Sequence, residues 1–135
     1  MIIDASVGIK LIKKNEEYRQ QSLIVLRNHF SGRQKIIIPS LFYIEVSNYL
    51  VTNSHSTLLT IKKHLEFFYE SRLICYESSR EDIFETLNLA KKYNTTVYDM
   101  LYAVVAKKHK TFLITADDKF IQKTKFSFVK HISAV

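Results

Sequence analysis

The chain has 135 residues, of which 47% are hydrophobic and 24% charged, with 20 Lys and Arg against 13 Asp and Glu. This length predicts one domain over residues 1–135, which can bury a core without a disulfide or a structural metal. Two glycines and one cysteine exclude a three-glycine dinucleotide fingerprint, a disulfide framework and a cysteine-rich zinc finger. The net charge of +7 favours a polyanionic partner such as nucleic acid.

Apolar runs and the helical spacing of apolar positions predict strands and helices that alternate along the chain. The first apolar run ends at Asp4, and Ser6 is the expected N-cap of the helix that follows. Ser79, with Asp82 three positions later, resembles a capping box. Strands are expected over residues 1–4, 35–38, 72–76, 111–115 and 128–132, and helices over 7–14, 18–30, 40–51, 55–69, 79–93, 97–107 and 117–123.

Strands separated by helices predict a parallel sheet that is covered on both faces. We expect a three-layer α/β/α sandwich with about four or five strands. The helix over 97–107 is apolar nearly all round and should be buried. Cys75 lies in the apolar run Leu73–Tyr76 and is predicted to be a buried, unreactive thiol. Asp4 interrupts the apolar start too early for a signal peptide, and no segment is typical of a membrane span, so we expect a cytoplasmic protein.

Four acidic residues lie where an unpaired carboxylate would be costly to bury. Asp4 ends the first strand and Asp117 follows the fourth, whereas Glu45 lies inside the apolar run Leu41–Val46 and Asp99 interrupts the most apolar helix. In a parallel sheet the carboxyl ends of strands and the first turns of the following helices share one edge, where open α/β folds bind ligands. The four carboxylates can therefore meet in one cleft.

Four carboxylates in one cleft repel one another. At ~5 Å and an effective dielectric constant of ~20, each ionised pair costs about 3 kcal/mol, so the cluster needs protons or cations. Oxygen ligands without His or Cys suit Mg²⁺ or Mn²⁺. A divalent metal held by carboxylates in a basic protein points to phosphodiester hydrolysis, in which the metal activates water and neutralises charge.

Each acid also has a structural interpretation. Asp4 and Asp117 could each cap the helix that follows, where Asp is common. Glu45 could pair with a buried Lys or Arg, and Asp99 could bind N–H groups in the first turn of its helix. Asp118 is the less certain alternative to Asp117.

Two hydroxyls near these acids are candidates for a supporting role. Thr115 ends a strand, but its hydroxyl could orient a ligand carboxylate. Ser6 has no His at a spacing that suggests a general base, so it is not expected to be a nucleophile.

Four motifs occur in order over essentially the whole chain. They are Ile2-Ile3-Asp4-Ala5-Ser6, Pro39-Ser40-Leu41 with Glu45-Val46-Ser47-Asn48, Thr96-Val97-Tyr98-Asp99-Met100-Leu101-Tyr102-Ala103, and Leu113-Ile114-Thr115-Ala116-Asp117. In this order they resemble a PIN domain, specifically the VapC-type toxin ribonucleases of prokaryotic toxin–antitoxin modules.

This resemblance implies a parallel sheet with flanking helices, RNA cleavage with Mg²⁺ or Mn²⁺, dimerisation, and inhibition by an antitoxin whose tail enters the acidic cleft. It places Asp4, Glu45, Asp99 and Asp117 on the family's acidic positions and Thr115 on its supporting threonine. The T-x-D spacing favours Asp117 over Asp118.

We therefore predict an endoribonuclease toxin that uses one or two metal ions. Asp4 and Asp99 would be the principal ligands, Glu45 and Asp117 would complete the site or order water, and lysines of the C-terminal third would hold the RNA backbone. One rival is a non-catalytic RNA- or protein-binding domain with the same fold. Another is a phospho-acceptor receiver domain, which usually needs an acidic pair after the first strand, where this chain has Asp4 alone.

Overall fold

Five short strands form the central sheet of this computed structural model, which describes residues 1–53 and 55–135. All four strand pairings are parallel, and the strand order is β3-β2-β1-β4-β5, which confirms the predicted parallel sheet. The strands are β1 (Ile2–Ile3), β2 (Ile37–Pro39), β3 (Ile74–Tyr76), β4 (Leu113–Thr115) and β5 (Val129–His131).

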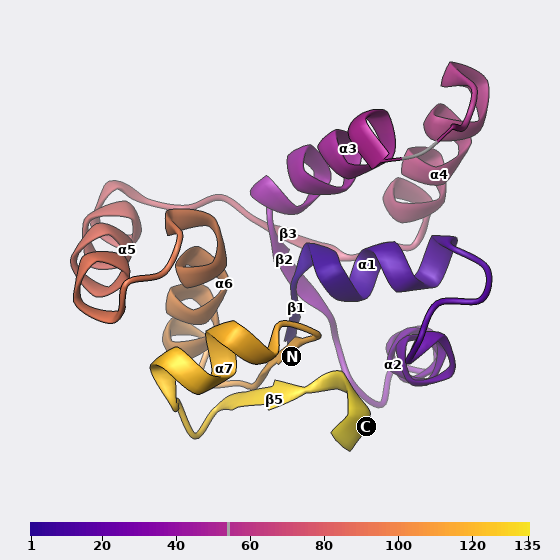
Figure 1. Cartoon of the computed structure of the whole chain (residues 1–135). Helices are drawn as coiled ribbons and strands as arrows, with labels where there is room; N and C mark the ends of the chain where they lie inside the picture. The colour runs from indigo at the N-terminus through magenta and orange to yellow at the C-terminus, as the bar shows by residue number, and fades with distance from the viewer. Residues whose placement is uncertain (54) are drawn as a thin grey trace.

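Helices cover both faces of the sheet. In Figure 1, α1 to α4 lie on one side of the strands, and α5 to α7 lie on the other. This arrangement confirms the three-layer α/β/α sandwich. In the described part of the chain, no helix is long and apolar enough to span a membrane. The helices are α1 (Ala5–Ile12), α2 (Arg19–Phe30), α3 (Leu41–Asn53), α4 (Leu58–Glu70), α5 (Arg80–Tyr93), α6 (Val97–Lys108) and α7 (Asp118–Thr124), with a 3₁₀ turn at Ile132–Ala134.

The chain reverses its direction across the sheet between β1 and β4. From β1 it proceeds outward through β2 to β3, and then returns to β4 on the other side of β1. Neighbouring strands whose connections leave in opposite directions open a crevice at their carboxyl ends, where open α/β sheets bind ligands. Asp4 follows β1 at this point, and Asp117 follows β4.

The core lies around the central strands and helix α6. Ile2 and Ile3 of β1 are fully buried, and every residue of α6 from Met100 to Ala106 is buried. The prediction of a buried, apolar helix in this region is confirmed. Because α6 runs into the start of β4, its first turn points to the opposite edge of the sheet, where β1 and β4 end.

The prediction that Cys75 is buried is wrong, because its side chain is exposed. Cys75 lies on β3, which is an edge strand of the sheet. An edge strand has a neighbour on one side only, so an apolar sequence there does not guarantee burial.

Aspartates take part in the N-terminal caps of α1 and α5. Asp4, and not Ser6 as predicted, is the N-cap of α1, because its carboxylate accepts the Val7 N–H at 3.1 Å. Ser79 and Asp82 form the predicted capping box of α5.

Asp82 also joins three elements of the fold. It accepts hydrogen bonds from the Tyr76 hydroxyl of β3 at 2.6 Å and from the Lys108 ammonium of α6 at 2.8 Å. These bonds fix the first turn of α5 against the edge strand and the end of α6.

Candidate active site

A cleft of about 550 Å³ opens where β1 and β4 end. Asp4, Glu45, Asp99 and Asp117 all line it, and they come from four separate segments of the chain. Among the described residues that line this cleft there is no Lys or Arg. The structure therefore brings the four acids together around one concave surface whose described lining contains no basic side chain.

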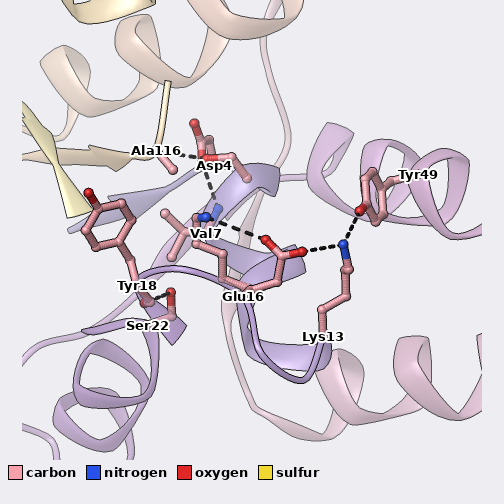
Figure 2. Close-up of polar contacts among 10 residues, drawn as sticks. Asp4, Val7, Lys13, Glu16, Tyr18, Ser22, Tyr49 and Ala116 are labelled. Atoms are coloured by element: carbon pink, nitrogen blue, oxygen red, sulfur yellow. Dashed lines mark hydrogen bonds and ion pairs between the residues drawn. The ribbon is translucent and has the colours of Figure 1, made fainter. Parts of the chain in front are cut away.

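Asp4 and Asp117 reach the cleft as N-caps of the helices that follow their strands. Asp4 Oδ1 accepts the Val7 N–H, as Figure 2 shows, and Asp117 Oδ1 accepts the Phe120 N–H at 3.0 Å. The structural interpretation of both acids is thus correct, but it is not complete. A carboxylate has two oxygens with several acceptor sites, so capping leaves each acid able to bind a further group in the cleft.

Two hydroxyls join Asp4 to the segment after β4. Ser6 Oγ donates to Asp4 Oδ1 at 2.6 Å and accepts the Ala116 N–H at 2.9 Å. Thr115 hydrogen-bonds to Asp4, and its Oγ1 accepts the Asp117 N–H at 2.9 Å. Burial raises the pKa of Asp4, and the hydrogen bonds from the two hydroxyls act against that rise. Ser6 and Thr115 therefore hold Asp4 in place.

Glu45 is hydrogen-bonded to a tyrosine. Within the described part of the chain it is not paired with a buried Lys or Arg, which was the alternative, purely structural role considered for it. The Tyr102 hydroxyl donates to Glu45 Oε2 at 2.5 Å, and Tyr102 is 1% exposed. Burial raises the pKa of Glu45, the bond from Tyr102 lowers it, and the charges of Asp99 and Asp4 raise it further. Tyr102 was not among the site residues predicted from the sequence. A tyrosine in a buried helix needs a partner for its hydroxyl, and Tyr102 lies three residues after Asp99 on the same helix face, which is the signal that could have identified it.

Asp99 is the third residue of α6 and bonds to the N-cap of that helix. Thr96 Oγ1 donates to Asp99 Oδ2 at 2.6 Å and accepts the Asp99 N–H at 3.1 Å. Burial raises the pKa of Asp99, and the charges of Asp117 and Lys123 act on it in opposite directions, Asp117 raising and Lys123 lowering it.

Asp118 lies outside the cleft. Its side chain is 73% exposed, and its Oδ1 is 3.9 Å from His131 Nε2. Asp117 lines the cleft and Asp118 does not, so the structure favours Asp117 of this pair.

The donor set of the cleft fits a hard divalent cation. Burial raises the pKa of Asp4, Glu45 and Asp99, and neighbouring acids add to the rise at each of them. A bound cation would remove this repulsion, and carboxylate oxygens are the ligands that Mg²⁺ and Mn²⁺ prefer. Over residues 1–53 and 55–135, however, no group of three or more His, Cys, Asp or Glu side chains is arranged so that it could hold a metal ion. Each carboxylate is turned toward its own hydrogen-bond donors, so binding would need the side chains to rotate toward one another.

The end of the cleft away from β4 is formed by α3 and carries polar and aromatic side chains. Asn48 and Tyr49 line it there, and Tyr98 lines it beside Asp99. The Lys13 ammonium of α1 donates to the Tyr49 hydroxyl at 2.9 Å and forms an ion pair with Glu16, as Figure 2 shows. These contacts fix the last turn of α1 against α3 at the rim of the cleft.

Solved structures with the same fold include prokaryotic toxins. PAE2754 from Pyrobaculum aerophilum has a TM-score of 0.73 and 23% identity, with 98% of this chain and 83% of that chain covered. A toxin–antitoxin complex from Klebsiella pneumoniae has a TM-score of 0.73 and 14% identity, with 97% and 96% covered. VapC20 of Mycobacterium tuberculosis, described as a sarcin–ricin loop cleaving toxin, has a TM-score of 0.69 and 8% identity, with 91% and 94% covered.

These identities show a shared fold. No curated protein matches the chain. The family model of the PIN domain matches residues 1–126, which is most of the sequence. The chain therefore belongs to the PIN-domain family.

Proposed function

We propose that this chain, as a single nuclease domain over residues 1–135, is a metal-dependent endoribonuclease that hydrolyses RNA phosphodiester bonds. The observation that carries the proposal is the convergence of Asp4, Glu45, Asp99 and Asp117 on one cleft whose described lining has no basic residue. Membership of the PIN-domain family supports it, as does the shared fold with a protein described as a sarcin–ricin loop cleaving toxin.

Asp4 and Asp99 are the proposed principal ligands of Mg²⁺ or Mn²⁺, with Glu45 and Asp117 completing the site or ordering water. A divalent cation bound there supplies Lewis-acid activation of water and neutralises charge at the phosphate. The chain's own contribution is orientation. The hydroxyls of Ser6 and Thr115 hold Asp4 at the wall of the cleft, and that of Tyr102 holds Glu45 there.

The proposed biological setting is a toxin–antitoxin module in the cytoplasm. A solved neighbour with this fold is a toxin–antitoxin complex, which supports a cognate antitoxin as a partner. An antitoxin tail that enters the cleft would place its cations among the four acids, where the lining offers none. A homodimer is proposed on the family resemblance.

The test is cleavage of a panel of structured and single-stranded RNAs with Mg²⁺, with Mn²⁺ and with EDTA. Cleavage is expected with either metal and should disappear in EDTA and in the Asp4→Asn variant. Asp118→Asn is the matched control, because it removes the same charge from an exposed position outside the cleft, and it should retain activity. Cleavage that survives EDTA and dialysis would overturn the metal requirement. RNA binding without cleavage under any metal would favour a non-catalytic binding domain.

A further inference from the structure

A second groove, of about 370 Å³, adjoins the acidic cleft. Asp99 and Asp117 line both, so the groove and the cleft share one wall. In contrast to the cleft, the groove is lined by basic side chains, those of Lys119 and Lys123 on α7. The chain thus places lysines directly beside the proposed catalytic acids, on the side away from α3.

Lys123 is held at a fixed place in this groove. Its ammonium donates to the backbone carbonyl of Asn94, at the end of α5, with an N···O distance of 2.6 Å. An ammonium has three N–H donors, so this bond leaves two for a further acceptor. The charge of Lys123 also acts on Asp99, so the ammonium lies near the wall that the groove shares with the cleft.

Lys119 is a second cation of the groove, and its ammonium is free to bind a ligand. The exposed Lys119 has no hydrogen bond or ion pair among the described residues. Two ammonium groups at one groove suit an anion that has several acceptor oxygens.

A phosphate of the substrate strand satisfies these requirements. Lysine binds phosphate as a point charge, and a phosphate contact does not demand a particular base. We propose that this groove binds the RNA phosphate next to the scissile one, with Lys123 as the fixed contact and Lys119 as a further donor. The inference rests on the proposed nuclease function and adds the path of the strand, which crosses from the acids onto α7.

The test combines RNA binding in EDTA with cleavage in Mg²⁺. Fluorescence anisotropy with labelled single-stranded RNA gives the dissociation constant over a range of salt concentrations, without any need for cleavage. Lys123→Ala should reduce the steepness of the log–log salt dependence by about 0.7, the value for one phosphate contact on a single strand. In the cleavage assay KM should rise about tenfold with kcat nearly unchanged, equally for RNAs of different base sequence.

Lys35→Ala is the matched control, because it removes the same charge from an exposed position just before β2, at the opposite edge of the sheet. Lys123→Arg keeps the charge and should retain the salt dependence. Since Lys123→Ala also removes the bond to Asn94, Lys119→Ala is tested as well, because that side chain holds no other element in place. Its salt dependence should also become less steep.

The outcomes separate the two proposals. If the wild type cleaves RNA but Lys123→Ala and Lys119→Ala behave as Lys35→Ala does, the phosphate site is wrong and the nuclease proposal stands. If the loss differs strongly among RNA sequences, the groove contacts bases, and the assignment to a phosphate is wrong. If the wild type neither binds nor cleaves RNA, the proposed function itself is overturned.

Discussion

Replacement of Asp99 by Asn separates a metal ligand from a purely structural acid. The substitution keeps the size of the side chain and its ability to accept from Thr96, but it removes the charge. If Asp99 serves a cation, the charge costs stability in the metal-free protein and contributes stability when Mg²⁺ is bound. If Asp99 only supports the first turn of its helix, the charge contributes stability in both conditions.

General magnitudes give the size of both effects. The charge of Asp117 acts on Asp99 and raises its pKa. For two unit charges at ~6 Å and an effective dielectric constant of ~20, repulsion is about 3 kcal/mol, and partial exposure to solvent reduces this to about 1–2 kcal/mol. Loss of the charge-assisted bond from Thr96 costs about 1 kcal/mol, because a neutral bond remains. Asp99→Asn should therefore leave the free energy of unfolding in EDTA unchanged or raise it by about 1 kcal/mol. In Mg²⁺ at a hundredfold excess over Kd, the wild type gains about 2.7 kcal/mol and the variant much less.

Thermal melting of both proteins, in EDTA and in Mg²⁺, measures these differences. For a chain of 135 residues, 1 kcal/mol shifts Tm by about 3–4 °C, so Mg²⁺ should raise the wild-type Tm by about 10 °C. Asp118→Asn is again the matched control and should respond to Mg²⁺ as the wild type does. A fall in Tm of several degrees for Asp99→Asn in EDTA would refute the reasoning, because it would make Asp99 a structural acid.

Three further predictions follow from particular contacts. Tyr102→Phe keeps the buried ring but removes the hydrogen bond to Glu45, so the Mg²⁺ concentration that gives half of the thermal shift should rise about 10–100-fold. An unchanged midpoint would show that Tyr102 contributes only to the packing of the core. Burial raises the pKa of Asp82, but the hydrogen bonds that its carboxylate accepts outweigh burial and lower this pKa from 3.8 to about 2. The ionised carboxylate therefore contributes about 2 kcal/mol to the free energy of unfolding above pH ~4, and this contribution is lost as the pH falls through about 2. Urea unfolding of Asp82→Asn at pH ~2–6 should lack this pH dependence. Gly8→Ala would place a Cβ 2.5 Å from the Phe42 ring, and the resulting overpacking should cost about 1–3 kcal/mol in a thermal melt.

The order of elements and the four candidate acids could be predicted because their signals are local. Apolar runs and helical spacing mark strands and helices wherever they occur, and an acid inside an apolar run is visible without a structure. The parallel sheet followed from the alternation of strands and helices, since crossover connections need a helix. Proximity of the acids followed from the rule that ligands bind at the carboxyl edge of such sheets.

Features that depend on packing between distant segments could not be predicted in the same way. Cys75 is exposed because β3 lies at the edge of the sheet. The order of strands in a sheet depends on pairing between distant segments, so it cannot be predicted from the local sequence of β3. The bond from Tyr102 to Glu45 joins residues 57 positions apart, on two helices that cover opposite faces of the sheet. The sequence could not distinguish Asp4 from Ser6 as the N-cap of α1, because both residue types are good N-caps.

The hydrogen bonds around the cleft explain how a folded protein tolerates four acids at one place. Capping accounts for Asp4 and Asp117, and donors from Thr96 and Tyr102 stabilise the other two acids. These donors hold the carboxylates without neutralising them, and no described Lys or Arg lines the cleft itself, although Lys123 of the adjoining groove acts on Asp99. An arrangement that served stability alone would pair or remove these charges, because unpaired buried charge is costly and apolar replacements of similar volume are often neutral or stabilising. A cluster that is held in place yet not neutralised is the arrangement expected of a site that binds cations, and this supports the proposed catalytic role of the four acids in addition to the capping role of Asp4 and Asp117.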